Sequence, residues 1–290
     1  MSRAPFLALA GLLALAACGP SVSKFPPSYW TGYENRLKAE GKLRTDRAPA
    51  DVPFTNADLV RNFAKTAFGL DPEFQRGLSA AELAETDMVM KWTGPISYAV
   101  FGRTTPDDRR QIIQLSDRLG RASGIPLQPV TRPERGGWNL GIYFFDHQAR
   151  VQLLADLASE REDMLLGVFT DLFSDEVICS GIMLHQTSPT GRRTGEIEFA
   201  FVFIRPELPR DLRLSCIEEE ISQGMGLIRD DDAVRPSLFN EDEEFAFLTL
   251  HDEYLLRILY DRRLKPGTRR VDAMPIVRRI ASELELPSDF

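Results

Sequence analysis

The spacing of apolar and polar residues divides the chain into short strands and longer helices. Apolar or alternating runs, which are typical of strands, occupy residues 95–102, 140–145, 177–184 and 195–204. Apolar residues recur every three or four positions, as on one face of a helix, in residues 55–69, 80–88, 105–119, 147–158, 212–227, 248–259 and 271–283. This order predicts an α+β fold, in which a mixed β-sheet packs with helices and is followed by C-terminal helices.

The N-terminal residues 1–17 have the pattern of a signal peptide. Arg3 is their only charged side chain, and the apolar run that follows is too short to span a bilayer as a helix, which needs about 20 residues. Residues 15–18, Leu-Ala-Ala-Cys, resemble the bacterial lipobox, and this resemblance implies that Cys18 becomes the lipid-modified first residue of the mature chain. An ordinary secretory signal with an unrelated cysteine is the alternative.

The resemblance also implies a location for the mature protein. Bacterial lipoproteins carry several acyl chains, which hold a protein stably to a bilayer. Residue 19 is Gly rather than the Asp that favours retention in the inner membrane. We therefore expect a lipid-anchored protein at the periplasmic face of the bacterial envelope, on the outer membrane rather than the inner one.

Proline is frequent between the lipobox and the first strongly amphipathic helix. Residues 18–53 contain five prolines and only a short helical pattern near residues 33–42, so we expect them to form a tether between the lipid and the folded part. Residues 54–290 contain no internal repeat and no low-complexity tract. They are expected to form a single globular domain.

The net charge limits which partners the protein can bind, and the number of cysteines predicts whether they form a disulfide. The chain has 35 Lys and Arg residues against 43 Asp and Glu residues, a net charge of −8. It therefore has no basic surplus to neutralise phosphates, and we expect no nucleic-acid partner. With Cys18 assigned to the lipid, Cys179 and Cys216 are left. Two cysteines in an oxidising compartment predict a disulfide, and two separate buried thiols are the alternative.

Residues 219–227 carry a pattern related to the catalytic helix of zinc peptidases. Those enzymes place two His one helical turn apart, with a general-base Glu after the first, in the order His-Glu-x-x-His-x-x-Gly-Leu. Here Glu220 matches the general base, and residues 226–227 match the Gly-Leu pair. Glu219 and Gln223 stand where the two His ligands would be.

Further segments extend the likeness. The third His position falls on Arg229, and Asp230 follows it. Residues 236–239 stand where metzincins have their Met-turn, with Phe in place of the Met, and residues 249–260 resemble the helix that follows this turn. Residues 91–263 as a whole therefore resemble a degenerate zincin that has lost its His ligands.

A closer resemblance is to a proteobacterial family of lipoproteins known as domain of unknown function 2927. The matching pieces are Lys91-Trp92, the strand with Cys179, residues 216–219 with Gln223, residues 226–227, residues 237–240, Leu259-Tyr260 and residues 264–267. The family has no assigned activity. The resemblance therefore implies a fold and a compartment but no reaction.

The possible metal ligands in residues 219–232 favour neither a zinc site nor a calcium-binding loop. Oxygen atoms such as those of Glu219, Gln223 and Asp230 suit a hard ion better than zinc. The acidic run 230–232 is not followed by the Gly that a calcium loop needs at its sixth position. We therefore expect no metal and no cofactor. A hydrogen-bonded polar cluster is expected instead, formed by Glu219, Glu220, Gln223, Arg229 and Asp230.

Two functions of different classes follow from these patterns. The first is a non-catalytic envelope lipoprotein that binds a peptide, a partner protein or a cell-wall component in the zincin cleft, between the edge strand and the helix with Glu220. The alternative is a metal-dependent hydrolase or peptidase that has atypical ligands and uses Glu220 as its general base. A purely structural envelope component is a third hypothesis. The replaced His ligands favour the first, in which the membrane is reached through Cys18.

Overall fold

The computed structural model describes residues 24–69, 83 and 85–287. The expected signal peptide, residues 1–17, and the expected lipid attachment site Cys18 lie outside these residues, as do residues 80–82 and 84 of the helix expected over residues 80–88. Within the described part of the chain, no helix combines the length and the apolar content needed to cross a membrane.

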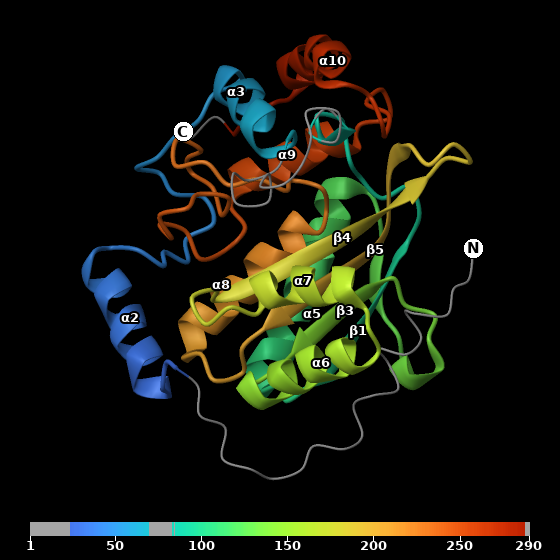
Figure 1. The fold of residues 1–290 in the computed structure, drawn as a ribbon. Coiled ribbons are helices and arrows are strands. Elements are labelled where there is room, and N and C mark those ends of the chain that lie inside the picture. Colours follow the sequence, from blue (N-terminus) through green and yellow to red (C-terminus); the bar gives the residue numbers. More distant parts are fainter. Residues whose placement is uncertain (1–23, 70–82, 84, 288–290) are drawn as a thin grey trace.

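Five strands of the described residues form one β-sheet (Figure 1). In chain order they are β1 (Ile96–Gly102), β2 (Leu127–Pro129), β3 (Leu140–Phe144), β4 (Cys179–Thr187) and β5 (Arg193–Ile204). Their spatial order is β2-β1-β3-β5-β4. β1, β2, β3 and β5 pair in parallel, whereas β4 runs antiparallel to β5. The sheet is therefore mixed, and β4 forms one of its edges.

Helices cover both faces of this sheet (Figure 1). One face carries α5 (Pro106–Ser123) and α8 (Arg210–Gln223), which pack against each other. The other face carries α6 (His147–Ser159) and α7 (Asp163–Leu172). A 3-10 turn, Pro133–Arg135, precedes β3.

Three more helices pack beside α5 and α8 at the upper end of the molecule in Figure 1. They are α3 (Asn56–Thr66), α9 (Leu250–Tyr260) and α10 (Arg270–Glu283). α9 contacts α5, and both α3 and α10 contact α9. The mixed sheet, its helices and these C-terminal helices confirm the predicted α+β fold class.

Two apolar cores separate the three layers. Ile142 of β3 and Ile217 of α8 have no exposed surface and belong to the larger core, between the sheet and α5 and α8. Tyr143 faces the opposite core, where its ring stacks on Phe101 at 4.7 Å and on Phe203 at 5.5 Å between centroids. Successive residues of β3 thus point into different cores, as the alternation of a strand requires.

The predicted strands and helices lie within a few residues of the observed ones, but β2 and α7 are absent from the prediction. β2 has only three residues, which is too short for an alternating pattern. Residues 164–169, Met-Leu-Leu-Gly-Val-Phe, are apolar or Gly throughout, so α7 has little polar face to set a helical period.

The segment that is expected to be a tether is packed onto the domain from residue 27 onward. α2 (Pro27–Ala39) starts earlier than the short helix expected over residues 33–42, and it buries Trp30, which is 2% exposed. The guanidinium of Arg205 lies 5.5 Å from the Trp30 ring. Pro27 starts the helix rather than a linker, because proline is tolerated in a first helical turn.

Candidate functional site

Helix α8 carries the residues that the sequence singles out. It begins after Pro209, whose backbone is extended, and ends at Gln223, with Gly224 as its C-cap. Leu214, Ile217 and Ile221 form its buried apolar stripe, and α8 contacts both β4 and β5. This packing places the polar residues of its C-terminal half beside the edge strand.

The carboxyl group of Glu220 lies against β4. Its Oε2 atom is 2.8 Å from the point where a Cβ on Gly181 would stand. The Glu220 residue is only 6% exposed, whereas Gly181 is exposed although it lies within β4. Within residues 24–69 and 85–287, no group donates a hydrogen bond to the Glu220 carboxyl. A buried acid without a donor among the described residues therefore lies against an exposed position of the edge strand.

Neighbouring carboxylates act on Glu220 through their charges. Burial first, and then the charges of Asp230 and Glu243, raise the pKa of Glu220 to about 8. Burial also raises the pKa of Glu243 to about 7. We call Glu220 and the two acids whose charges act on it the acidic site: Glu220, Asp230 and Glu243.

The other residues of the expected polar cluster lie on α8 and in the loop that follows. Nε2 of Gln223 donates to both carboxyl oxygens of Asp230, at 3.1 Å and 2.9 Å. Glu219 is half-buried on α8, and Arg229 is half-buried in the loop, where its backbone N–H donates to the Thr66 carbonyl at 3.2 Å. The structure thus joins Gln223 to Asp230, two members of the expected cluster, and the charge of Asp230 acts on Glu220.

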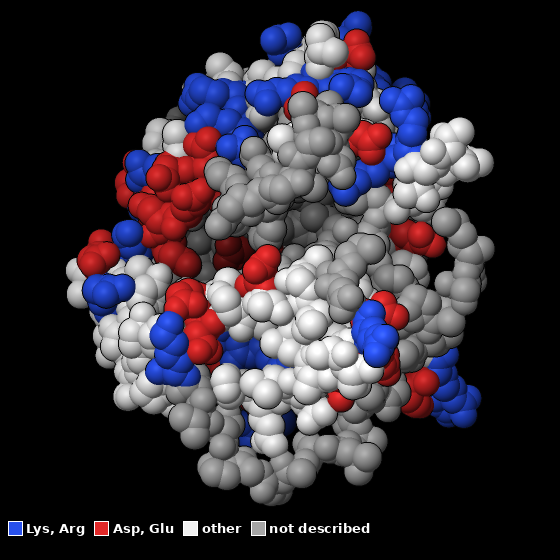
Figure 2. Space-filling model, viewed as in Figure 1, with Lys and Arg blue, Asp and Glu red and all other residues white. Residues whose placement is uncertain are grey.

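The loop between α8 and α9 brings further acids to one side of a hollow in the surface. Residues 230–232 are three Asp, and residues 241–244 are Glu-Asp-Glu-Glu. Figure 2 shows a hollow near the middle of this face, with acidic side chains gathered on its left side, where Figure 1 places this loop. The hollow is therefore bordered by negative charge.

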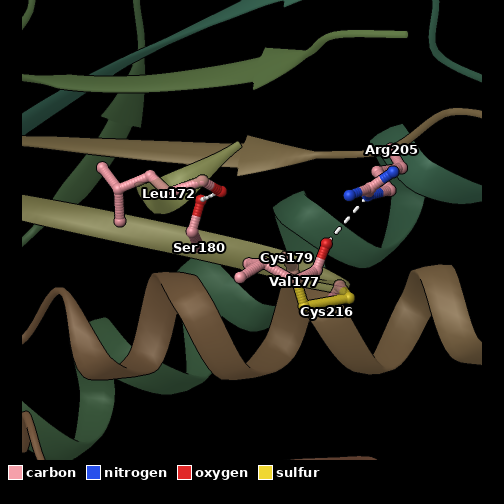
Figure 3. Close-up of a disulfide and its surroundings, with 6 residues drawn as sticks. All are labelled: Leu172, Val177, Cys179, Ser180, Arg205 and Cys216. Atoms are coloured by element: carbon pink, nitrogen blue, oxygen red, sulfur yellow. Dashed lines mark hydrogen bonds between the residues drawn. A yellow bond between two sulfur atoms is a disulfide. The ribbon is translucent and has the colours of Figure 1, made fainter. Parts of the chain in front are cut away.

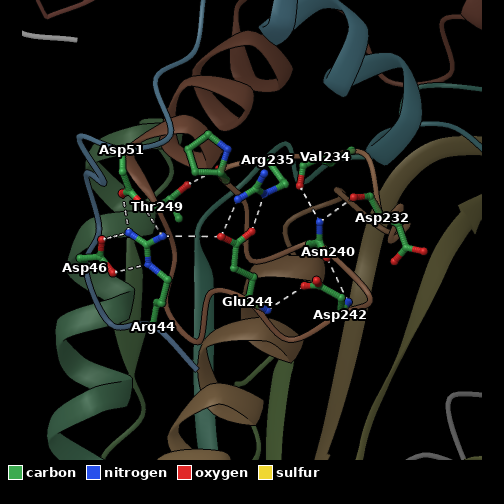
Figure 4. Close-up of polar contacts among 11 residues, drawn as sticks. Arg44, Asp46, Asp51, Asp232, Val234, Arg235, Asn240, Asp242, Glu244 and Thr249 are labelled. Atoms are coloured by element: carbon green, nitrogen blue, oxygen red, sulfur yellow. Dashed lines mark hydrogen bonds and ion pairs between the residues drawn. The ribbon is translucent and has the colours of Figure 1, made fainter. Parts of the chain in front are cut away.

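Several acids of this loop are held by cations. Glu244 accepts from Arg235 at 2.7 Å and lies 3.6 Å from Arg44 (Figure 4). Asp231 accepts from Lys65 at 2.6 Å. These ion pairs fasten the loop to the rest of the domain. The acidic site differs from them, since its central carboxyl has no such partner among the described residues.

Comparison with known proteins identifies the family. The model of DUF2927, described as a protein of unknown function, matches residues 56–279. The chain belongs to the DUF2927 family. Curated proteins give no match to the sequence. A solved structure of myroilysin aligns with 76% of this chain and with 99% of its own length, with 13% sequence identity and a TM-score of 0.34.

Several residues that match the DUF2927 pattern fasten the end of α8 to α9. Nε1 of Trp92 donates to the Gly224 carbonyl at 2.8 Å, and the Tyr260 hydroxyl donates to the Met225 carbonyl at 2.8 Å. Nζ of Lys91 donates to a carbonyl in the last turn of α9 at 2.9 Å. Burial lowers the pKa of Lys91 to about 8. These contacts support the fold of the DUF2927 domain.

Gly226 occupies a position that other residues do not fit. Its φ is +106°, and a Cβ added there would stand 2.1 Å from the Met90 carbonyl oxygen. Glycine is therefore required for backbone packing. This packing explains the match of Gly226 to the zinc-peptidase pattern.

The segment that resembles a Met-turn supports the start of α9. Asp252 accepts from the Ser237 hydroxyl at 2.6 Å, from the Leu238 N–H at 2.9 Å and from the Thr249 N–H at 2.9 Å. Asp252 has no exposed surface, and neither does its neighbour His251, which is hydrogen-bonded to α3. The segment and His251 are therefore part of the packed interior.

The donor set of the DUF2927 chain does not fit a zinc ion. The three positions where zinc peptidases have His hold Glu219, Gln223 and Arg229. A guanidinium cannot ligate a cation, and a neutral amide is a poor zinc ligand. In the part of the chain that the structure describes, no three His, Cys, Asp or Glu side chains converge in a way that could hold an ion. Glu220 is thus a buried acid beside an edge strand, without the ligands of a zinc peptidase.

A disulfide fastens β4 to α8 close to the acidic site. Cys179, the first residue of β4, is bonded to Cys216 of α8, with their Cα atoms 5.8 Å apart (Figure 3). This bond confirms the predicted pairing. Gly181 follows Cys179 by two positions and Glu220 follows Cys216 by four, so the crosslink holds the two halves of the site together.

Hydrogen bonds support the same end of β4 (Figure 3). Nε of Arg205 donates to the Val177 carbonyl at 2.9 Å, and the Ser180 hydroxyl donates to the Leu172 carbonyl at 3.3 Å. Burial lowers the pKa of Arg205 to about 10, so its hydrogen bonds are made by a largely enclosed cation. The start of the edge strand is therefore held on both sides.

Gly181 and Glu243 belong to the site but are absent from the prediction. A Gly inside a strand run often marks a close approach of another group, and this signal was available for Gly181. Glu243 lies in a loop that only the fold brings to α8. Its φ of +61° is uncommon for a residue with a side chain, and the sequence carries no sign of it.

Proposed function

We propose that this protein is a lipid-anchored lipoprotein of the bacterial envelope, whose domain does not catalyse a reaction but binds an extended peptide segment of an envelope partner along β4. The anchor is Cys18, and the partner's segment adds a strand to the sheet. The observation that carries the proposal is the free edge of β4. Among the described strands, none pairs with its outer side.

The sequence of β4 supports this role. Natural proteins protect long edge strands against pairing with charged residues, with proline or with bulges. β4 runs over nine residues, Cys-Ser-Gly-Ile-Met-Leu-His-Gln-Thr, and contains no Lys, Arg, Asp, Glu or Pro. Its irregularities come only after Leu184. The first half of β4 therefore keeps the flat geometry that strand addition uses.

The donor set argues against the peptidase alternative. Zinc peptidases need His ligands on the helix to activate water, and here those positions hold Glu219, Gln223 and Arg229. The cleft between an edge strand and a helix still offers main-chain hydrogen bonds to an extended peptide. Binding can therefore persist where the reaction is lost.

The test of binding uses a phage library of random extended peptides, selected on the purified protein, followed by affinity measurements on the selected sequences. We expect micromolar binders whose affinity is lost when alternate backbone N–H groups of the peptide are methylated, because strand addition depends on main-chain hydrogen bonds. Binders that tolerate N-methylation at every position would contradict strand addition. Cleavage of a selected peptide that Glu220→Gln abolishes would favour the hydrolase instead.

The test of the anchor follows a labelled fatty acid in a proteobacterial host. We expect label on the wild-type protein, and none on Cys18→Ala. Equal labelling of both proteins, or of neither, would contradict the lipid anchor.

A further inference from the structure

We infer that the acidic site receives a cationic side chain, Lys or Arg, from the peptide strand that pairs with β4. This inference rests on the proposed function and names the chemistry of the partner at one position.

The first step is the state of Glu220. The residue is 6% exposed, and no group of the described residues donates a hydrogen bond to its carboxyl. Desolvating an acid without a partner costs free energy. Such a group in a packed domain indicates a partner that comes from outside the described residues, and we assign it to the bound peptide.

The second step is the sign of the surrounding charge. The charges that act on Glu220 are those of Asp230 and Glu243, and both disfavour its ionised form. Among the cations of this region, Arg235 pairs with Glu244, Lys65 pairs with Asp231, and Lys42 acts on Glu243. None of these charges offsets the two that act on Glu220, so a positive group placed beside its carboxyl would be attracted there.

The third step is the direction from which the cation arrives. Residues directly opposite each other on paired strands place their side chains on the same face, with Cβ atoms about 5 Å apart. The Cβ direction of Gly181 points at Glu220, whose Oε2 lies 2.8 Å from the Cβ position. A partner residue opposite Gly181 would therefore send its side chain toward the acidic site. Because Gly181 has no side chain, the Glu220 carboxyl can approach the strand this closely, where it would meet the incoming group.

An amine or guanidinium fits this site better than a metal ion. In the described residues, no three His, Cys, Asp or Glu side chains converge closely enough to hold an ion. A guanidinium or ammonium group needs only to donate charge-assisted hydrogen bonds to separate carboxylates. Lys and Arg also have the long apolar stems that can cross the space beside β4.

The experiment uses short blocked peptides of alternating threonine and valine, with one central residue varied among Arg, Lys, citrulline and norleucine. Citrulline keeps the shape of Arg without its charge, and norleucine does the same for Lys. On the wild-type protein we expect Arg and Lys to bind about tenfold tighter than their neutral counterparts. Glu220→Gln and Gly181→Leu should each reduce this preference to less than about twofold.

The matched control is Glu241→Gln. It removes the same charge from an exposed position of the acidic loop, and the preference for Arg and Lys should survive. Loss of preference in this control would mean that the overall negative potential, and not the acidic site, attracts the peptide, and it would overturn the inference.

Other outcomes separate the two proposals. Equal binding of all four peptides to the wild-type protein would overturn the cation site and leave strand addition intact. A preference that persists in Glu220→Gln would also overturn the site. If no peptide binds at millimolar concentration, the proposed function fails and the inference fails with it.

Discussion

Two buried glutamates on helix α8, Glu218 and Glu220, differ in the hydrogen bonds that their carboxyl groups accept. Glu218 has no exposed surface and accepts two hydrogen bonds from Arg47, at 2.7 Å and 3.0 Å, one from the Leu248 N–H at 2.9 Å and another from Gln111. Glu220 is almost as deeply buried but accepts none from the described residues.

This difference shows that Glu218 has a structural role in the domain, whereas Glu220 does not. Glu218 connects the N-terminal segment, α5 and the loop before α9, so its cost of burial is offset within the chain. Glu220 has the charges of Asp230 and Glu243 beside it instead, and its pKa is raised to about 8. A buried group that the fold leaves unsatisfied is a candidate for binding something else.

Removing the charge of Glu218, the glutamate whose hydrogen bonds are satisfied, should have the largest effect on the stability of the domain. We expect Glu218→Gln to lower the free energy of unfolding by about 3–5 kcal/mol, because it leaves the Arg47 cation without its carboxylate. Urea unfolding followed by circular dichroism measures this change. The neighbouring variant Glu219→Gln is the control and should cost less than about 1 kcal/mol. Similar losses in both variants would contradict the special role of Glu218.

Removing the crosslink between β4 and α8 should have the next largest effect. The Cys179–Cys216 bond spans 37 positions in sequence, and a loop of this length corresponds to roughly 3–4 kcal/mol of stabilisation on the chain-entropy model. We expect the double variant Cys179→Ser, Cys216→Ser to lose about this much in urea unfolding. An unchanged unfolding midpoint under oxidising conditions would show that the fold holds the edge strand without it.

The smallest expected effect on stability comes from Glu220, the glutamate without a hydrogen-bond donor among the described residues, and it depends on pH. The pKa of Glu220 is raised from its ordinary value of 4.5 to about 8, so the folded state binds more protons than the unfolded state between these values. Its contribution to stability is full below pH 4.5 and is lost as the pH rises through about 8. We expect the wild-type protein to lose about 1–3 kcal/mol between pH 5 and pH 8.

Glu220→Gln should flatten this dependence and should be more stable than the wild type at pH 8. Part of the slope should persist, because the pKa of Glu243 is also raised. Above pH 8 the lowered pKa of Lys91 acts in the opposite direction, so the comparison is made below that value. Parallel stability profiles for the two proteins would contradict the unsatisfied state of Glu220.

The sequence predicts the framework of this domain well, because its elements follow simple spacing rules. β3 is an apolar run, β5 alternates in part, and α9 begins after Thr249, whose side chain caps the helix together with Asp252. α7 and β2 escape prediction, since neither has a pattern that local rules detect.

The site is predicted only in part. Glu220 and Gln223 follow from their places in the zinc-peptidase pattern, and Asp230 from its place after the third ligand position. Gly181 and Glu243 join them only through the approach of β4 and of the loop before α9, which no spacing along the chain encodes. Glu218 and Glu220 look alike in the sequence, and only the fold distinguishes them.

The most direct test of the central claim is a titration of the Glu220 carboxyl by carbon-detected nuclear magnetic resonance, with Glu220→Gln used to assign its signal. The account predicts a midpoint near pH 8, because the group is buried beside two other acids and no described residue donates a hydrogen bond to it. A midpoint at or below 4.5 would show that the chain already supplies a partner for this carboxylate, and the account would then be wrong.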